Sequence, residues 1–170
     1  MSELNEIELK WYPVCTKARA EKKVAEALVS KGIEVYLPLH RQLKQWSDRK
    51  KWVEEPLIQS YLFVQIREPD KNIILNTKGV ARFIYFSGEI ASMPERQIEA
   101  LKLLMASPCE LEITTGVLLP GEKIVVKAGP LKGLHGEVMG QRLQKKIIVR
   151  LESIGYSIII HMAASYIGRL

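Results

Sequence analysis

The residue types that most often carry out catalysis are scarce in this sequence and do not form a catalytic set. The three histidines, His40, His135 and His161, adjoin no serine, cysteine or carboxylate in a recognisable motif. The adjacent carboxylates Glu54 and Glu55 lie beside basic residues, as ordinary surface charge does. The sequence therefore predicts a protein that is not an enzyme, and nothing in it indicates a cofactor.

Neither a metal site nor a membrane anchor is predicted. The two cysteines, Cys15 and Cys109, lie far apart without metal-ligand spacing, and we interpret both as reduced structural residues. No apolar run approaches the roughly 20 residues that span a bilayer, and residues 1–10 lack a signal-peptide pattern. We therefore expect a cytoplasmic, monomeric protein without a membrane partner.

A segment rich in basic and aromatic residues offers a different chemistry, the binding of nucleic acid. Between Arg41 and Trp52 the chain has five basic residues, one acidic residue and two tryptophans. Basic side chains can contact phosphates while aromatic rings stack on bases, and the net charge of +6 suits an acidic partner. The alternative is a solvated β-hairpin with its tip at residues 47–49, and the sequence leaves both interpretations open.

The segment 60–66 belongs to the strongest predicted strand and has two chemically different faces. Side chains alternate across a strand, so the aliphatic residues from Leu62 to Ile66 share a face that suits a core. Tyr61 and Phe63 share the other face. Two uncovered aromatic rings would form a docking surface for another protein, whereas helices packed over them would make the rings part of the core.

Strands and helices alternate over residues 1–107, which predicts an α+β domain with an antiparallel sheet flanked by helices. Helices are predicted at 17–31, where Gly32 provides a stop, and at 70–76, where an aspartate is the N-cap. A third helix begins at Ser92, because a serine followed three residues later by a glutamate forms a capping box. The predicted strands are residues 9–16, 33–38, 57–66 and 79–86.

Short strands separated by turns predict a small β-barrel over residues 120–170. The loop 127–136 contains three glycines and a proline, which allow the chain to turn sharply. Residues 108–119 have two acidic residues, no basic residue and no clear period, and are predicted to be a linker. The stretch is apolar for a linker, which leaves open that it packs on a neighbouring element. The predicted strands of the barrel are residues 123–127, 136–139, 147–151 and 156–162, with 166–167 closing it.

Two parts of the sequence resemble a known family of transcription factors. Residues 121–138 closely resemble the KOW motif, which occurs in NusG-type factors and in some ribosomal proteins. Upstream, residues 11–14, the helix after them, 60–64 and 79–84 are similar to the N-terminal domain of NusG in order and spacing. The two domains in this order are highly specific for NusG-type factors. The resemblance implies a NusG-type sheet domain followed by an SH3-like KOW barrel. The KOW loop residues are Gly129, Pro130, Gly133 and Gly136.

The sequence is closer to specialised members of this family than to housekeeping NusG. Where NusG has Phe-Pro-Gly-Tyr, this sequence has Ile-Gln-Ser-Tyr at 58–61. It resembles RfaH and, through residues 46–52, the UpxY antiterminators of capsular polysaccharide operons. The β-branched runs 147–149 and 158–160 favour strands over the helices that the corresponding region of RfaH can form.

The resemblance implies three contacts with a bacterial transcription complex. The N-terminal domain would bind the clamp helices of the RNA polymerase β′ subunit through an apolar groove that contains Cys15, Tyr61 and Phe63. Phe83 and Ile84 would either border this groove or belong to the core. A weaker contact, with the gate loop of the β subunit, would be made by Asp70, Lys71 and Asn72. The non-template DNA strand would lie against Lys17, Lys31, Thr77 and Lys78, whose lysines suit phosphates rather than bases.

The implied function is transcription elongation or antitermination at particular operons. Binding to both sides of the main cleft would favour the closed, processive polymerase, and the KOW barrel would recruit a second partner such as the ribosome or Rho. The alternative is a KOW-type ribosome- or RNA-binding protein without a polymerase role. The N-terminal domain distinguishes them, because a ribosomal protein has no need of the face that carries Tyr61 and Phe63.

Overall fold

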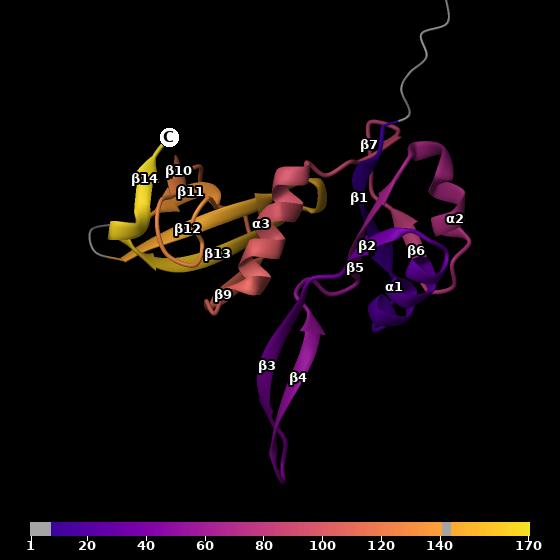
Figure 1. Ribbon diagram of the computed structural model, residues 1–170, viewed down its shortest axis with the longest axis horizontal. Coiled ribbons are helices and arrows are strands. Elements are labelled where there is room, and N and C mark those ends of the chain that lie inside the picture. The colour runs from indigo at the N-terminus through magenta and orange to yellow at the C-terminus, as the bar shows by residue number, and fades with distance from the viewer. Residues whose placement is uncertain (1–7, 141–143) are drawn as a thin grey trace, which may run out of the picture. The chain divides into compact units, whose positions relative to one another are not determined.

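The computed structural model describes residues 8–140 and 144–170. The chain divides into two compact units, Met1–Glu95 and Arg96–Leu170. Both helices and antiparallel sheets are present (Figure 1), so the predicted α+β class is confirmed. No helix in the described residues combines the length and apolar character needed to cross a membrane.

A four-stranded antiparallel sheet is the scaffold of the first unit. Its order is β2-β5-β1-β6, so β5 and β1 are central. The register pairs Val14 with both Leu62 and Phe83, and pairs Cys15 with Tyr61. Cross-strand partners lie on the same face of a sheet, and the register therefore decides which side chains meet. The strands are β1 (Lys10–Thr16), β2 (Glu34–Tyr36), β5 (Tyr61–Ile66) and β6 (Val80–Phe83).

Two helices pack on one face of this sheet, α1 (Glu21–Ser30) and α2 (Lys71–Leu75), with a 3₁₀ turn, η1 (Glu68–Asp70), before α2. Helix α1 begins four residues later than predicted, because Arg19 has a φ of 60° that a right-handed helix cannot include. It stops as predicted at Gly32, whose φ of 78° favours glycine.

The core of the first unit lies between this sheet face and the two helices. The aliphatic face predicted for β5 is confirmed, since Leu62 and Val64 have no exposed surface and Ile66 has 2%. Burying one such side chain stabilises a fold by roughly 1.5–3 kcal/mol. The other members of this core with no exposed surface are Val14, Val24, Leu28, Ile74 and Phe83.

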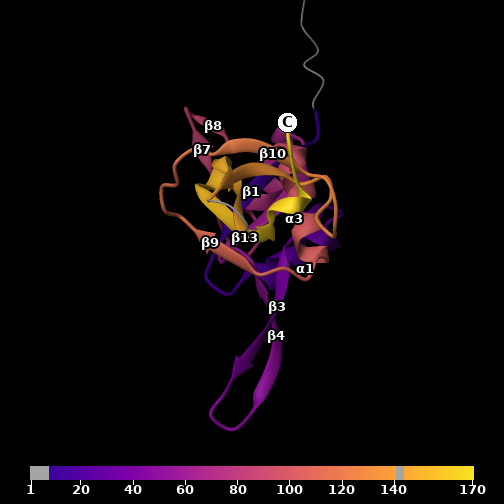
Figure 2. The same ribbon diagram turned by 90° about the vertical axis from the view of Figure 1, so that its left-hand side faces the viewer.

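Two hairpins stand outside the four-stranded sheet. The strand predicted at 79–86 is divided, because β7 (Tyr85–Phe86) turns back at a Ser-Gly pair to join β8 (Glu89–Ile90). Both turn residues have positive φ, 51° and 86°, as tight hairpin turns require. The second hairpin, β3 (Leu39–Gln45) with β4 (Lys50–Pro56), projects from its unit (Figures 1 and 2) and confirms the hairpin predicted with its tip at 47–49.

The second unit contains α3 (Glu95–Ala106) and a six-stranded antiparallel sheet. Helix α3 begins at the glutamate of the predicted capping box. All the predicted barrel strands are present within a few residues, in the order β14-β10-β11-β12-β13-β9. The 3₁₀ turns η2 (Glu152–Ile154) and η3 (Ala164–Tyr166) connect strands. The strands are β9 (Leu111–Thr114), β10 (Glu122–Val126), β11 (His135–Met139), β12 (Gln144–Leu151), β13 (Tyr156–Ala163) and β14 (Ile167–Arg169).

The segment predicted as a linker, 108–119, contributes an edge strand to this sheet. Strand β9 pairs with β13, with Ile113 opposite Ile158 and Leu111 opposite Ile160. The sequence of so short a segment does not reveal that it forms a strand, because the strand depends on pairing with β13, which lies far along the sequence. The boundary between the compact units falls at 95/96, so α3 is grouped with the C-terminal strands, whereas the sequence placed it in the N-terminal domain.

Candidate functional site

The predicted docking residues Cys15, Tyr61 and Phe63 lie on the sheet face opposite to the helices. Cys15 is the direct cross-strand partner of Tyr61 in the β1–β5 ladder, and Phe63 follows two residues later on the same face. Tyr61 is half-buried and Cys15 is buried, with 8% exposed. The structure therefore brings these residues together on the face that side-chain alternation predicted.

Phe63 is not the uncovered ring that the sequence suggested. Its exposure is 0%, and the ring of Tyr36 in β2 stacks on it at a centroid distance of 6.5 Å and an interplanar angle of 28°. Tyr36 reaches this position because β2 pairs with β5, with Tyr36 opposite Phe63. The expectation of two exposed aromatics is thus wrong for Phe63, which can contact another protein only in a conformation that uncovers it.

The prediction that Phe83 borders the groove is wrong. Phe83 is paired with Val14 on the core face, and its ring meets that of Tyr12 edge to face at 6.3 Å. It is fully buried there, on the opposite side of the sheet from Tyr61. The next residue, Ile84, is half-buried, and its carbonyl accepts a hydrogen bond of 2.8 Å from the N–H of Ala91.

A buried glutamate, which no sequence pattern singled out, supports the start of β5. Oε1 of Glu21, in the first turn of α1, accepts a hydrogen bond of 2.7 Å from the N–H of Ser60. Ser60 has a φ of 62°, and its carbonyl accepts a hydrogen bond of 2.9 Å from the N–H of Thr16. These two bonds hold the backbone of Ser60, the strained residue immediately before Tyr61. They therefore fix the direction in which the Tyr61 side chain points.

Two of the predicted DNA-contact residues bond directly to each other. The ammonium group of Lys31 donates a hydrogen bond of 2.8 Å to the hydroxyl of Thr77, which in turn donates one of 2.9 Å to the carbonyl of Ile73. Thr77 is 4% exposed, whereas Lys31 is exposed. The buried hydroxyl therefore holds one end of an exposed cationic side chain in place.

The other two predicted DNA-contact residues lie on either side of a close approach between α1 and the start of β6. The N–H of Lys17 donates a hydrogen bond of 2.8 Å to the carbonyl of Gly79, the residue after Lys78. A Cβ at Gly79 would lie 2.7 Å from a methyl carbon of Val24, and the φ of Gly79 is +97°. Only glycine fits there, and the neighbouring Lys17 and Lys78 are exposed to solvent.

The three residues predicted to meet a gate loop form the start of a short surface helix. Asp70 occupies the predicted N-cap position of α2, but its side chain makes no capping hydrogen bond. The ammonium group of Lys71 lies 3.9 Å from the carboxylate of Glu68, and Asn72 is exposed. An exposed ion pair of this kind contributes little to stability, so these side chains are available for other contacts.

The N-terminal part of the chain matches a known family. Residues 9–102, more than half of the sequence, match the family model described as "Transcription termination factor nusG". The chain belongs to the NusG family. NusG proteins are transcription factors rather than enzymes, and the residues described above all lie within the matched region.

One solved structure shows that the chain has a NusG fold. The chain is similar to a structure described as "Domain interaction in Thermotoga maritima NusG", with a TM-score of 0.55 and 18% sequence identity over 96% of this chain and 98% of that one. It also matches one described as "Crystal Structure of MjSpt4:Spt5 complex conformation B", with a TM-score of 0.32 and 16% identity over 93% and 95% of the two chains. At such identity, the first similarity shows the fold and assigns no residue a role.

In this NusG-family chain the residues predicted to form a KOW loop shape the backbone. Gly129 and Gly133 have φ of +81° and +91°, and the N–H of Gly133 donates a hydrogen bond of 2.8 Å to the carbonyl of Val126. A Cβ at Gly136 would lie 2.7 Å from a methyl carbon of Ile147. Pro130 is exposed between two of the glycines. The geometry therefore explains the glycines by turn conformation and close packing, without a ligand.

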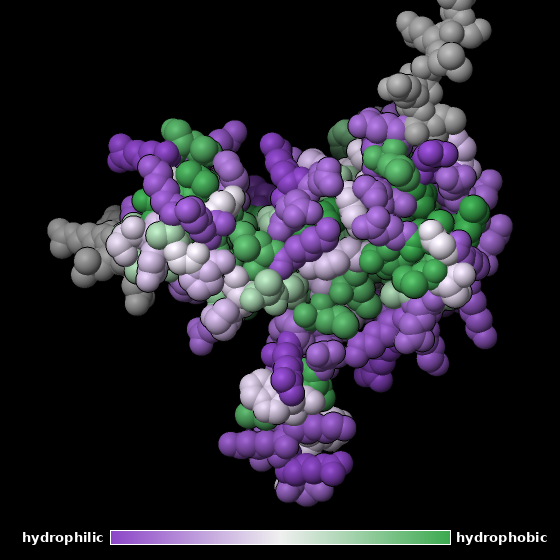
Figure 3. Space-filling view, viewed as in Figure 1, coloured by the Kyte–Doolittle hydropathy of each residue, from purple (hydrophilic) through white to green (hydrophobic). Residues whose placement is uncertain are grey.

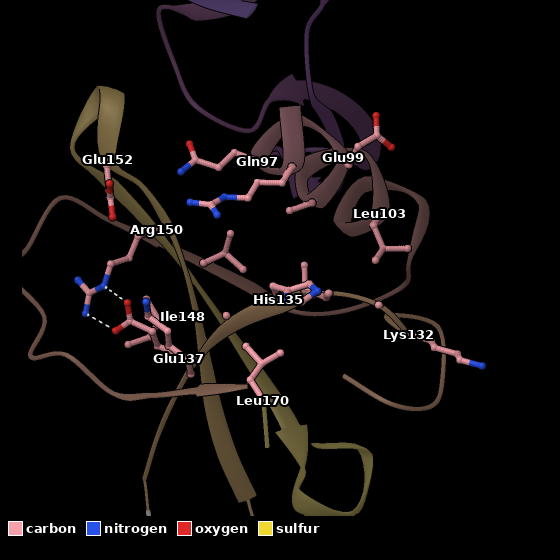
Figure 4. A pocket seen from close by; sticks show the side chains of 17 residues that line it. Gln97, Glu99, Leu103, Lys132, His135, Glu137, Ile148, Arg150, Glu152 and Leu170 are labelled. Carbon is pink, nitrogen blue, oxygen red and sulfur yellow. Dashed lines mark hydrogen bonds and ion pairs between the residues drawn. The ribbon is translucent and has the colours of Figure 1, made fainter. Parts of the chain in front are cut away.

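An ion pair beside this loop fixes the chain after β9. The guanidinium of Arg150 donates hydrogen bonds of 3.0 and 3.1 Å to the carboxylate of Glu137 (Figure 4). It donates others of 3.1 and 2.9 Å to the carbonyls of Leu118 and Leu119. The hydrogen bond from Arg150 is the main cause that lowers the pKa of the Glu137 carboxyl below its ordinary value. A second cause is the N–H of Gly121, which donates to Glu137 at 3.0 Å.

A pocket of about 710 Å³ lies within the second unit (Figure 4). Side chains of α3, among them Arg96 and Leu103, line one part of it, and residues of β11 and β12, among them His135, line another. Of the predicted site residues only Gly133 and Gly136 line it. Within residues 8–140 and 144–170 no cluster of His, Cys, Asp or Glu could hold a metal ion, and both cysteines are free thiols.

Proposed function

We propose that this protein is a transcription elongation and antitermination factor that binds bacterial RNA polymerase and promotes processive elongation at particular operons. The observation that carries the proposal is the NusG-family match over residues 9–102, the part of the chain that contains the Cys15–Tyr61 face. The alternative, a KOW-type ribosome- or RNA-binding protein without a polymerase role, does not account for a family match to this N-terminal region.

The polymerase contact is proposed on the sheet face away from α1 and α2. Tyr61 is a half-buried aromatic residue of this face, and the thiol of the largely buried Cys15 lies beside it. An aromatic anchor that becomes desolvated in a complex contributes roughly 2 kcal/mol or more to binding. Ile84 is half-buried and is kept in the proposed contact. Phe63 would join it only after its ring is uncovered, because it has no exposed surface.

The nucleic-acid contact proposed for this role is the non-template strand. Lys31, held by Thr77, together with Lys17 and Lys78, offers three exposed ammonium groups on the first unit. Ammonium groups on flexible stems suit phosphates and carry no base specificity. A gate-loop contact at Asp70, Lys71 and Asn72 would add a second polymerase site.

The proposed mechanism is a shift between two states of the polymerase. A factor that binds both sides of the main cleft stabilises the closed, elongating form over the paused form, provided that its affinity for the two forms differs. The KOW region would recruit the ribosome or Rho. We further propose a cytoplasmic monomer of the specialised RfaH and UpxY type, since Gln59 and Ser60 stand where NusG has proline and glycine.

Transcription with purified polymerase tests this proposal. Templates with and without the promoter-proximal region of the operon that neighbours the protein's own gene should be compared for read-through of a downstream terminator. A specialised factor increases read-through on the first template and leaves the second unchanged. Equal read-through on every template, with and without the protein, would refute the proposed function.

A further inference from the structure

We propose that the β3–β4 hairpin is a second nucleic-acid-binding element, which takes up a single strand by stacking its bases on Trp46 and Trp52. This inference goes beyond the proposed function, because none of the residues assigned above to polymerase or DNA lies on the hairpin. Its support comes from the geometry, exposure and charge of residues 39–56.

The hairpin is an arm and not part of the core. Strands β3 and β4 form a separate two-stranded sheet, and the hairpin projects away from the rest of its unit in both ribbon views (Figures 1 and 2). Its base is tied down, since Lys22 of α1 donates a hydrogen bond of 2.8 Å to the carbonyl of Glu54. The tip is closed by a hydrogen bond of 2.8 Å from the N–H of Trp46 to the carbonyl of Arg49.

Large apolar side chains near the tip are exposed to solvent without a role in the fold. Trp46 and Trp52 are each 56% exposed, and Leu43, the cross-strand partner of Trp52, is 48% exposed. The third tryptophan of the chain, Trp11, is 4% exposed. Two tryptophans exposed on a projecting element indicate a binding surface.

The charge of the arm selects the class of partner. From Arg41 to Trp52 there are five basic residues and only Asp48 as an acid. One of the five, Lys44, is paired with Glu55, and its hydrogen bond is the main cause that lowers the pKa of that carboxyl. The other four form no ion pair with any residue that the structure describes. They are Arg41, Arg49, Lys50 and Lys51.

Basic and aromatic groups alternate along the arm in a way that suits a nucleic acid strand. The guanidinium of Arg41 lies 5.2 Å from the centroid of the Trp52 ring, a cation–π contact that orients both groups. Figure 3 shows hydrophilic side chains over most of the hairpin, with a small hydrophobic area among them. An acidic partner with flat aromatic groups matches this surface, and single-stranded nucleic acid has both features. A purely apolar protein partner would leave the four cations without counter-charges.

The test is a binding titration of the full chain with labelled oligonucleotides of roughly 12 nucleotides. The affinities for single-stranded RNA, single-stranded DNA and duplex DNA of the same sequence are compared, which shows whether the arm prefers RNA, DNA or a duplex. We expect binding to a single strand with quenching of tryptophan emission, because the two exposed rings stack on bases. Substitution of Trp46 or Trp52 by alanine should weaken binding by about tenfold each, and substitution by phenylalanine should retain most of the affinity while reducing the quenching.

Matched control variants separate stacking from general charge and from folding. Phe86→Ala removes an aromatic residue that is 78% exposed on the other hairpin, and it should leave binding unchanged. The double variant Lys50→Ala with Lys51→Ala should reduce the slope of log affinity against log salt by roughly 1.4 for a single strand. The double variant Lys23→Ala with Lys146→Ala removes the same charge elsewhere and should reduce it less. Because Trp52 pairs with Leu43, the loop variant Trp46→Ala is decisive if Trp52→Ala disturbs the hairpin.

Three outcomes would overturn the proposal. One is affinity of Trp46→Ala for every oligonucleotide equal to that of the wild type. Another is binding without a change in tryptophan emission, which would mean phosphate contact alone. The third is no binding of nucleic acid together with a crosslink from position 46 to a protein subunit of the transcription complex, which would make the arm a protein-docking element.

Discussion

Glu21 and Ser60, 39 residues apart in the chain, are joined by a hydrogen bond of 2.7 Å from the backbone N–H of Ser60 to the carboxylate of Glu21. Glu21 is only 5% exposed, and Ser60 has the left-handed φ of 62° that directs the chain into β5. Helix α1 and the proposed docking face are therefore coupled through one buried polar contact, and the position of Tyr61 depends on it.

Removing this contact should destabilise the fold. Glu21→Ala leaves the Ser60 N–H without its acceptor, which costs roughly 1–3 kcal/mol in the free energy of unfolding. Glu21→Gln keeps an acceptor oxygen and should lose less, and Glu26→Ala, at an exposed position on the same helix, should lose almost nothing. Urea unfolding of the three variants measures this. Equal stability of Glu21→Ala and Glu26→Ala would contradict the role given to Glu21.

Phe63 should behave as a core residue in stability measurements. Because the ring is fully buried against Tyr36, Phe63→Ala should lower the free energy of unfolding by roughly 3–5 kcal/mol. Phe63→Leu, which keeps more of the volume, should cost less. Thermal unfolding of both variants gives the comparison. A Phe63→Ala protein as stable as the wild type would mean that the ring is not packed as described.

The Lys31–Thr77 pair should contribute to the binding of the non-template strand. Lys31→Ala removes one phosphate contact, and the slope of log affinity against log salt should fall by roughly 0.7 for a single strand. Thr77→Val removes the hydroxyl that holds the ammonium group and should weaken binding in the same direction. Lys23→Ala, on the exposed surface of α1, is the control. The salt slope is measured by titration with the single strand, and the contact itself by crosslinking to the non-template strand in an assembled elongation complex. Identical crosslinking yields for Lys31→Ala and Lys23→Ala would rule the contact out.

The Glu137–Arg150 pair should make the stability of the second unit depend on acid pH. The pKa of Glu137 is lowered in the folded state, so the pair stabilises the fold above the pKa of an unfolded glutamate, and this contribution disappears as pH falls through the folded-state value. A charged hydrogen bond of this type contributes roughly 1.5–3 kcal/mol. Glu137→Gln should therefore be less stable than the wild type at neutral pH and approach it in acid. Glu110→Gln, at an exposed position, should show no such convergence.

Local patterns predicted the elements well where residues next to each other in sequence determine the outcome. The alternation in 60–66 placed Leu62 in the core, the glycine at position 32 ended α1, and the strands of the C-terminal sheet followed their β-branched runs. The same alternation shows why Phe83 and Ile84 could not line one groove, since adjacent strand residues point to opposite faces. Phe83 belongs with Val14 in the core.

Contacts between distant segments could not be predicted in this way. The ring of Tyr36 covers Phe63 through the β2–β5 pairing, and Glu21 bonds Ser60 across the gap between a helix and a strand. Strand β9 exists because β13 offers it an edge. Each of these depends on tertiary structure, which overrides weak local propensity in short segments. Alternation thus placed Tyr61 and Phe63 on the sheet face away from the helices, as the structure has them, but it did not predict that Phe63 is buried.

The binding of purified bacterial RNA polymerase to Tyr61→Ala, measured against the wild type, tests the central claim most directly. Tyr61 is half-buried, so truncation of its side chain should leave the fold intact. Phe86→Ala, which truncates another aromatic side chain in the same unit, is the control variant. We expect the dissociation constant of Tyr61→Ala to rise about thirtyfold, the equivalent of roughly 2 kcal/mol, and that of Phe86→Ala to stay unchanged. Wild-type affinity for polymerase in a folded Tyr61→Ala protein would contradict the claim that this face binds the polymerase.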